Sequence, residues 1–407
     1  AQFVSATGMP PSIMHSLREA PEQCQQLISH LNLLWPMSMD LLGDRDRERF
    51  EFGRIPDSLR DLLNNLKAPL QPLLQGLDKL NDLLQESLDD KNEGEFSRDI
   101  AESWHGPIGL MLARAEAMWE ALTWLAAEEK EGELPVARWL SRMPFGEDWD
   151  IKLSASPIAI GDQLRRTLWW RCHGSVVTSA TLTALNSFGK LSWEAGLPDW
   201  ADFHRVASPF NYPELGSLEV VQLASDPKSE NFQQDVENWM RDNIDLEAGT
   251  LMLFSSRAQL EATRDTFIRD WYEKLLCQGF LPKSEIVRRH KERIDKGEGS
   301  LIFGLASFAE GIDLPGDYLT HVVIVKIPFA VPDDPIQAAT SEWIESRGRN
   351  SFMDLTLPAA SIRLVQACGR LIRKEDDQGK VSILDKRLSS HRYGRALLEA
   401  LPPLKRI

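Results

Sequence analysis

The sequence predicts an α/β protein: a domain built on a parallel sheet in the second part of the chain, preceded by an all-helical part. Leucines recur at helical spacing over residues 1–150, whereas short β-branched runs separated by helical stretches follow after residue 170. The charge divides at the same place. Residues 1–150 carry 14 basic and 27 acidic side chains, and residues 151–407 carry 32 and 34.

The first part shows two apolar stripes with the spacing of packed helices. The stripes are Leu59, Leu62, Leu63, Leu66 and Leu70, and Met111, Ala115, Met118, Leu122 and Leu125. Pro69 and Pro72 interrupt the first stripe, and we expect them to divide it into two helices. The acidic, polar residues 88–95 between the stripes predict a surface connection. This part is therefore predicted to be a helical layer.

Six apolar runs predict the strands of the later domain. They are SVVTSATL (175–182), LEVVQL (218–223), TLMLFSS (250–256), SLIFGL (300–305), HVVIVKIPF (321–329) and KVSILDK (380–386). Continuous apolar strands that alternate with helices are typical of a parallel sheet covered on both faces. Residues 207–216, with two prolines and a glycine, predict a linker. Ligands of such sheets bind beyond the carboxyl ends of the strands.

Composition limits the classes of function. The sequence has no apolar run of about 18 residues and no signal-peptide pattern, so we expect a cytoplasmic protein without membrane contact. The four cysteines, Cys24, Cys172, Cys277 and Cys368, are far apart, which predicts reduced and mostly buried thiols. The net charge of −15 disfavours a nucleic-acid partner, yet it is concentrated in residues 1–150. The nearly neutral second part could hold local basic strips.

Polar side chains follow two of the predicted strands. In VTSATL (177–182), the hydroxyls of Ser179 and Thr181 can relay hydrogen bonds between two sites. In LFSSR (253–257), Ser255, Ser256 and Arg257 can hold a sugar-phosphate backbone. A helix N-cap formed by one of the two serines explains the second pattern equally well.

Two further segments point to a nucleotide. Glu310, Gly311 and Asp313 form a tight acidic turn directly after the SLIFGL run, where a carboxylate can accept from a ribose hydroxyl and a glycine allows close approach. A purely structural turn is the alternative. In QACGRLIRK (366–374), Arg370 and Arg373 are three residues apart. We expect them to share one helical face and to clamp a phosphate together.

Taken in order, these motifs and the later DKR (385–387) resemble the C-terminal motifs of superfamily 2 helicases, most closely the DinG branch of the XPD-like DNA helicases. The resemblance implies that the parallel sheet is RecA-like, the fold of P-loop NTPase motors. Residues 1–150 would be the helical arch-like insertion, 151–206 the C-terminal end of the first RecA-like domain, and 207–407 the second. The resemblance covers about residues 150–407 by motif.

The resemblance also implies roles for the motif residues. Arg370 and Arg373, with Gln366 beside them, would reach the γ-phosphate of ATP as catalytic residues. Glu310, Gly311, Asp313 and Gly369 would line the nucleotide. Ser255, Ser256, Arg257 and Ser307 would face the nucleic acid. Ser179, Ala180 and Thr181 would couple hydrolysis to movement.

The chain departs from the family pattern in one large respect. It has no Walker A loop and no Asp-Glu-x-His box, because Gly189-Lys190 and Gly379-Lys380 are followed by leucine and valine. We therefore expect a truncated chain that is inactive as an ATPase alone. The ATP and Mg²⁺ site would be completed by residues missing from it. An iron–sulfur cluster, if the parent has one, would lie in the missing N-terminal part.

The leading hypothesis is the C-terminal portion of an ATP-dependent DNA helicase that moves 5′ to 3′ on single-stranded or forked DNA. Its expected partners are the missing N-terminal helicase domain and a protein at the acidic helical region. Two alternatives stay open. One is a non-catalytic module, derived from a helicase, that binds protein or DNA; the other is a CRISPR-associated DinG-like helicase.

Overall fold

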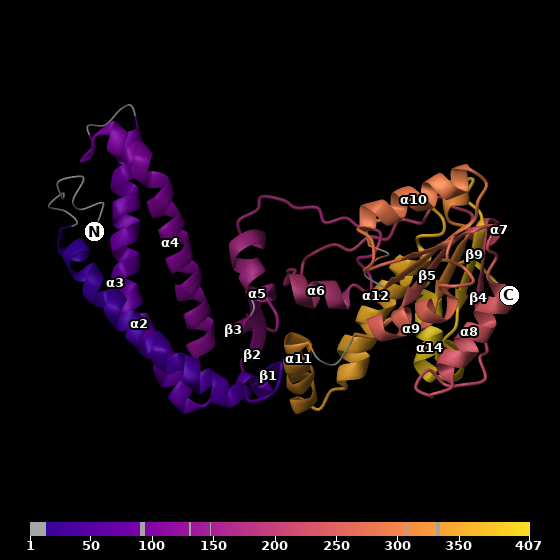
Figure 1. Cartoon of the computed structure of the whole chain (residues 1–407), viewed down its shortest axis with the longest axis horizontal. Coiled ribbons are helices and arrows are strands. Elements are labelled where there is room, and N and C mark those ends of the chain that lie inside the picture. The colour runs from indigo at the N-terminus through magenta and orange to yellow at the C-terminus, as the bar shows by residue number, and fades with distance from the viewer. Residues whose placement is uncertain are drawn as a thin grey trace. The chain divides into compact units, whose positions relative to one another are not determined.

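The computed structural model describes residues 14–89, 94–129, 132–146, 148–305, 308, 310–330 and 334–407. Contacts along the chain divide it into two compact units. Unit 1 extends to Ile158 and also takes in a later segment that ends at Arg349. Unit 2 takes the chain from Ala159 and again from Asn350 to Ile407. Figure 1 labels the elements of both units.

Three long helices make up most of unit 1. They are α2 (Met14–Leu42), α3 (Asp57–Leu88) and α4 (Arg98–Ala126). Leu63 and Leu66 of α3 share a core with Leu122 and Leu125 of α4, and the two helices lie side by side in Figure 1. Leucines at helical spacing thus form one buried face, because every third or fourth residue returns to the same side of a helix. The helical region that the sequence predicts ahead of the sheet domain is confirmed.

The expected break at Pro69 and Pro72 is wrong. Helix α3 runs without interruption from Asp57 to Leu88 and contains both prolines. A proline in a helix removes a hydrogen bond and disfavours the helix by about 3 kcal/mol. Here Leu66, Pro69 and Leu70 are buried in the core. Tertiary packing of this face on the neighbouring helices outweighs the local preference.

Unit 1 also contains a three-stranded antiparallel sheet, so the expectation of an all-helical first part is wrong. The strands are β1 (Arg47–Arg49), β2 (Val136–Phe145) and β3 (Asp148–Pro157), in that order. In β3, polar Asp148, Asp150 and Lys152 alternate with Trp149 and Ile151. This period of two is the strand signal in the sequence. Trp149 and its neighbours therefore belong to a hairpin.

Arg138 of β2 joins the hairpin to the helices. Its side chain is 1% exposed. Its Nε donates to the carbonyl oxygen of Trp124 (3.0 Å), Nη1 to that of Gly53 (2.6 Å) and Nη2 to that of Ala127 (2.6 Å). It also forms an ion pair with Glu129. Burial lowers the pKa of Arg138, and the charge of Glu129 opposes this shift. The guanidinium thus satisfies the carbonyls at the end of α4.

Helix α11 (Pro335–Ser346) belongs to unit 1 although it lies within the later part of the sequence. Its Ala339 packs in a small cluster with Ala137 and Ile158. The carboxylate of Glu342 accepts a hydrogen bond from the backbone N–H of Phe52 (2.7 Å) and pairs with Arg49. Unit 1 therefore extends beyond residue 150 and is completed by a helix from between two segments of unit 2.

Unit 2 is built on a seven-stranded sheet in which every pair is parallel. The strands are β4 (Gly216–Val220), β5 (Gly249–Phe254), β6 (Leu275–Cys277), β7 (Ser300–Leu305), β8 (His321–Ile324), β9 (Gly379–Ile383) and β10 (Lys405–Arg406). Their order is β10-β4-β9-β8-β5-β7-β6. Five of the six predicted runs form strands here, which confirms the parallel sheet. Strands β6 and β10 are too short to give a sequence signal.

Helices cover both faces of this sheet (Figure 1). The longer ones are α8 (Phe232–Asn243), α9 (Arg257–Phe267), α10 (Lys283–Asp295), α12 (Leu357–Cys368) and α14 (Arg392–Ala400). Leu251 and Leu253 of β5 face one core, and Met252 and Phe254 face the other. Side chains of a strand alternate between faces. The continuous apolar runs in the sequence follow from burial on both faces.

The prediction that SVVTSATL forms a strand is wrong. Residues 175–180 have no regular structure, and Val176 is 92% exposed. A strand needs a neighbour for its backbone hydrogen bonds, and the described sheets contain no pairing for this run. Unit 2 has only short elements before its sheet: α5 (Gly161–Leu164), η2 (Arg165–Trp169), α6 (Gly189–Ala195) and α7 (Tyr212–Leu215). The predicted linker 207–216 contains α7.

The cysteines differ in environment. Cys277 and Cys368 are buried, and burial raises their pKa values to about 11 and about 12. Cys24 and Cys172 are exposed, so the expectation of mostly buried thiols holds for two of the four. Among the described helices, none combines the length and the apolar character that crossing a bilayer requires.

Candidate functional site

Two of the predicted site segments follow the carboxyl ends of parallel strands of unit 2. Strand β5 ends at Phe254 and β7 ends at Leu305, and these two residues are register partners. The segment that begins at Ser255 and the loop that leads to Glu310 therefore leave the same edge of the sheet. This is the edge at which parallel α/β sheets bind ligands.

The serine pair after β5 serves partly as a helix cap. The Oγ of Ser256 accepts a hydrogen bond from the backbone N–H of Gln259 (3.3 Å) at the start of α9. Arg257 follows at the first helical position and is exposed, with a loose ion pair to Glu261 (3.9 Å). The cap explanation thus holds for Ser256, while Ser255 and Arg257 keep side chains at the strand end. Ser307 lies outside the described residues.

The acidic turn after β7 brings its backbone toward a lysine. Gly311 has a φ of +68°, a left-handed conformation that favours glycine. The Nζ of Lys283 donates to the carbonyl oxygen of Glu310. Ile312 is buried, whereas the carboxylates of Glu310 and Asp313 are exposed. The turn is anchored by one apolar side chain and presents its charges to solvent.

Arg370 and Arg373 converge on this turn. The Nη1 of Arg370 donates to the carbonyl oxygen of Ile312 (2.8 Å), and the Nη2 of Arg373 reaches the same oxygen at 3.5 Å. The Nε of Arg373 lies 3.5 Å from Oδ1 of Asp313. The structure thus brings together three residues that the sequence analysis placed in two separate motifs.

The predicted helical face shared by Arg370 and Arg373 is wrong. Helix α12 ends at Cys368, so Arg370 and Arg373 lie in the turn after the helix and share no helical face. Gly369 is the C-cap with a right-handed φ of −68°. Leu371 is buried in the sheet core, which draws the chain inward between the two arginines.

A buried carboxylate, which the sequence analysis missed, fixes this turn. Asp377 accepts hydrogen bonds from the backbone N–H groups of Arg373 (2.6 Å), Lys374 (2.8 Å) and Gly316 (2.8 Å). It therefore joins the arginine turn to the loop after the acidic turn. In the sequence, Asp377 stands in the polar run KEDDQGK, which looks like solvated surface. The pattern alone gives no signal that one of these carboxylates is buried.

The electrostatics of Arg370 favour an anion nearby. Its Nε is buried and has no hydrogen-bond partner among the described residues. Burial lowers the pKa of Arg370, and the like charge of Arg373 lowers it further. The guanidinium stays protonated, because the ordinary pKa of arginine exceeds 12. The carboxylates of Glu310 and Asp313 compensate part of the charge of the two arginines, and a phosphate would compensate more of it.

Gln366 lies near the predicted coupling segment. Its Nε2 donates to the Oγ1 of Thr181 at 3.4 Å, and the backbone N–H of Thr181 bonds to the Oγ of Ser179 at 3.3 Å. Leu185 also donates its N–H to the Oγ of Ser361 on α12 (3.2 Å). Ala180 lies in the same exposed loop. This loop is therefore held at the helix that leads to the two arginines.

The buried Asp385 of the DKR segment has a structural role. Its carboxylate accepts from the backbone N–H of Ile327 (2.9 Å) and forms an ion pair with Arg387 (2.6 Å). In the part of the chain with described coordinates, no cluster of three or more His, Cys, Asp or Glu side chains has the arrangement of a metal site. The site thus offers cations for a phosphate and separate exposed carboxylates.

Comparisons with known proteins identify what the chain is similar to. Residues 243–404 match the family of the helicase C-terminal domain. The chain is 37% identical over 365 residues to the ATP-dependent DNA helicase DinG of Photobacterium profundum, which covers 88% of this chain and 52% of that protein. It is 36% identical over 411 residues to DinG of Escherichia coli K12, covering 98% of this chain and 56% of that protein. The chain spans about half the length of the curated relatives it matches.

One solved structure has the same fold over almost the whole chain. An XPD helicase superposes with a TM-score of 0.51 at 16% identity, covering 96% of this chain and 64% of that protein. At that identity the likeness concerns the fold. Together with the sequence matches, it confirms the resemblance to the C-terminal region of DinG-like and XPD-like superfamily 2 helicases and the RecA-like character of the sheet.

Proposed function

We propose that this relative of the DinG helicases is the arch-like and second-motor portion of an ATP-dependent DNA helicase. The observation that carries the proposal is the convergence of Arg370 and Arg373 on the carbonyl oxygen of Ile312, in the loop between β7 and β8. The two guanidiniums have spare donors and no carboxylate that fully neutralises them. Such a pair suits the charge that develops on a transferred phosphoryl group.

The residues present fit the phosphate end of a nucleotide. Arg370 and Arg373 would contact the γ-phosphate, with Gln366 beside them. The exposed carboxylates of Glu310 and Asp313, with Gly311 and Gly369, would face the remainder of the nucleotide. A Walker A loop and Mg²⁺ ligands would come from the first RecA-like domain of a longer parent protein. Bound ATP supplies the phosphoryl group whose transfer to water drives the motor.

The loop at Ser179–Thr181 would couple the nucleotide site to movement. The hydrogen bond between Gln366 and Thr181 supports this role, because it links the loop to the helix that precedes the arginine turn. A shift of the arginines upon hydrolysis would change this bond. The loop would then alter its position relative to the first RecA-like domain.

The DNA would pass the carboxyl ends of β5 and β7. Ser255, Arg257 and Ser307 would contact the sugar-phosphate backbone of a single strand, as the exposed side chain of Arg257 at the end of β5 supports. Family resemblance implies 5′ to 3′ movement on single-stranded or forked DNA, and the sequence pattern suggests a cytoplasmic location. Residues 1–150 would be the arch, 151–206 the end of the first motor domain and 207–407 the second, with α11 packed on the arch side.

The decisive experiment compares ATP hydrolysis by two lengths of the protein. The 407-residue chain should show no ATPase activity with or without single-stranded DNA. A longer parent that includes the upstream Walker A loop and acidic box should hydrolyse ATP, and single-stranded DNA should stimulate it. Substantial activity of the 407-residue chain would reject the half-enzyme proposal. A parent gene without a Walker A loop would favour the non-catalytic binding module instead.

A further inference from the structure

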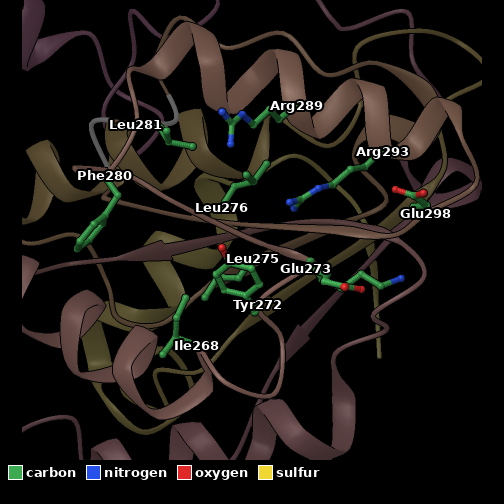
Figure 2. A pocket seen from close by; sticks show the side chains of 11 residues that line it. Ile268, Tyr272, Glu273, Leu275, Leu276, Phe280, Leu281, Arg289, Arg293 and Glu298 are labelled. Atoms are coloured by element: carbon green, nitrogen blue, oxygen red, sulfur yellow. The ribbon is translucent and has the colours of Figure 1, made fainter.

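A pocket of about 770 Å³ lies in unit 2, beside β6, the last strand in the sheet order. Figure 2 shows the side chains that line it. Leu275 and Leu276 of β6 lie along it, Tyr272 precedes the strand, and Phe280 follows it. The proposed function assigns no role to this pocket. Its size is that of a site for a small organic ligand.

Two aromatic rings line the pocket and are open to solvent. Tyr272 is 72% exposed and Phe280 is 59% exposed. The guanidinium of Arg264 lies 3.9 Å from the centroid of the Phe280 ring and occupies one face of it. Exposed aromatic side chains in a hollow of a soluble protein mark binding surfaces. Their flat faces suit a planar base, which stacks on them with little sequence preference.

Two arginines of α10 point toward the same space (Figure 2). Arg289 uses its Nε for an ion pair with Glu285 (2.6 Å). The Nη1 of Arg293 is buried and has no hydrogen-bond partner among the described residues. Burial lowers the pKa of Arg293, and the charge of Arg289 adds to the effect. A phosphate placed between the two guanidiniums would supply the acceptor that Arg293 lacks.

Two carboxylates restrict where a phosphate can bind. Glu273 and Glu298 also line the pocket, and Figure 2 shows them toward the Arg293 end, away from Phe280. They would repel a phosphate placed at that end. The favourable arrangement puts the phosphate beside Arg289 and on the side of Arg293 that faces away from the two glutamates, and it puts the base on the aromatic side. This combination matches one nucleotide unit.

The pocket adjoins the proposed DNA contact. The Nη1 of Arg257 lies 3.1 Å from the position that a Cβ would take at Gly279, the residue before Phe280. Gly279 has a φ of +96°, which together with this approach favours glycine. Strands β5 and β6 both pair in parallel with β7, so Arg257 and Phe280 follow strand ends at one edge of the sheet. A strand that contacts Arg257 can reach the pocket directly.

We propose that this pocket binds one nucleotide unit of the single strand that passes Arg257, with its base stacked on Tyr272 and its phosphate held by Arg289 and Arg293. The proposal rests on the proposed function, because it extends the DNA path named there. It enlarges the footprint of unit 2 on the strand by a subsite at β6.

The test measures binding of fluorescent oligothymidylates to the 407-residue chain by anisotropy at low salt. One strand of about 5 nucleotides and one of about 14 span the usual range of single-strand site sizes. Tyr272→Ala should weaken binding of the longer strand by about 5-fold or more, as loss of one stacking contact predicts. Arg289→Ala should also weaken it. Tyr272→Phe, which keeps the ring, should bind the longer strand as tightly as the parent does. The affinity for the shorter strand should fall less in Tyr272→Ala and Arg289→Ala than the affinity for the longer strand.

The possible results separate the two proposals. In one result, Tyr272→Ala and Arg289→Ala both bind the longer strand as the parent does, while Arg257→Ala binds it more weakly. This result would overturn the pocket assignment and leave the proposed DNA contact of Arg257 standing. The reverse pattern would overturn the Arg257 contact. Equal affinity for free thymidine monophosphate and the longer strand, both reduced by Tyr272→Ala, would assign the pocket to free nucleotides and overturn the strand proposal. Photocrosslinking of 5-iodouracil DNA to Tyr272 would support it directly.

Discussion

Two arginines in the two units differ in how completely the fold satisfies their donors, and we propose that only one of them binds a ligand. Arg138 in unit 1 is fully buried and donates to three carbonyl oxygens and to Glu129. Arg370 in unit 2 is half-buried, donates to the carbonyl oxygen of Ile312, and keeps a buried Nε without a partner among the described residues. Arg138 forms an ion pair with Glu129, whereas the described residues give Arg370 no direct ion pair and place the like charge of Arg373 beside it.

The difference follows from the cost of burying charge. A buried guanidinium is tolerated when a carboxylate and several acceptors compensate for lost hydration. Arg138 meets this condition within its own unit. Arg370 does not, so part of its interaction energy is available to an anion from outside. The two arginines thus differ in their unused donors as well as in their burial.

The largest expected effect tests the binding side of this comparison. In a longer parent that hydrolyses ATP, Arg370→Ala or Arg373→Ala should lower kcat by about 10³-fold, as removal of an arginine finger does. The free energy of unfolding should change by about 1 kcal/mol or less, since each loses few hydrogen bonds. Steady-state kinetics and thermal melts measure the two quantities.

The control for these variants is Arg395→Ala, because Arg395 lies on the exposed side of α14 and pairs only with Glu399 among the described residues. It should leave both kcat and melting unchanged. If Arg370→Ala and Arg373→Ala instead lower the stability and cause no separate loss of kcat, the GRLIR turn has a structural role. Arg370 would then resemble Arg138.

The structural side predicts a large loss of stability. Arg138→Ala should destabilise unit 1 by about 3–5 kcal/mol, because three buried or partly buried carbonyl oxygens lose their donor and an ion pair is broken. Urea unfolding followed by tryptophan fluorescence measures this change. Arg98→Ala, which removes an exposed pair with Glu102 on α4, should change it by less than about 0.5 kcal/mol. Similar effects of the two substitutions would contradict the assignment of Arg138.

A buried histidine extends the comparison to a group that can lose its charge. His321 in β8 bonds Ser382 Oγ through Nε2 (2.9 Å), and burial lowers its pKa to about 3. In the unfolded chain this pKa is near 6.5. The unfolded state therefore binds the proton first, and stability falls as the pH drops below about 6.5. The loss from this one residue should reach about 2 kcal/mol between pH 7 and pH 5.

Urea unfolding of the parent and of His321→Gln at pH 7 and pH 5 measures the contribution of His321 to the pH dependence of stability. The stability gap between the two proteins should narrow by about 2 kcal/mol on going from pH 7 to pH 5. His290 is also buried with a lowered pKa, so the variant should keep part of the pH dependence. Identical pH profiles would show that His321 can be protonated in the folded state.

The smallest effect concerns an exposed arginine. Arg257→Ala should weaken single-strand binding by a few-fold at low salt and lower the slope of log affinity against log salt by about 1. The loss should be similar for strands of different base composition, as a backbone contact requires. Filter binding over a range of salt concentrations measures it. A loss confined to one base sequence would indicate base recognition instead.

The parallel sheet could be predicted because burial on both faces leaves a continuous apolar run for each central strand. Runs such as SLIFGL and TLMLFSS therefore identified β7 and β5. The hairpin of β2 and β3 was not predicted, although Trp149, Ile151 and Leu153 alternate with polar residues, because the partner strand VARWLSRMPF has no such alternation. SVVTSATL has the composition of a strand, yet a strand also needs a partner, and no local pattern reports one.

The site shows the same limit. The motifs identified Arg370, Arg373 and Asp313, and these residues do meet. Their meeting depends on the end of α12 at Cys368, on burial of Leu371 and on the carboxylate of Asp377. These are tertiary features, and Asp377 has no distinctive sequence neighbours. Residue types and order were predictable, whereas the contacts that hold them together were not.

The return of α11 to unit 1 has a mechanical consequence. The chain passes from one unit to the other at three points, near residues 158, 331 and 350. The two units are thus joined by three covalent connections instead of one. It also means that a motor fragment starting after Ile158 would retain a helix whose apolar residues, including Ala339 and Ile344, had lost their cover. Such a fragment should aggregate unless residues 335–346 are removed with the arch.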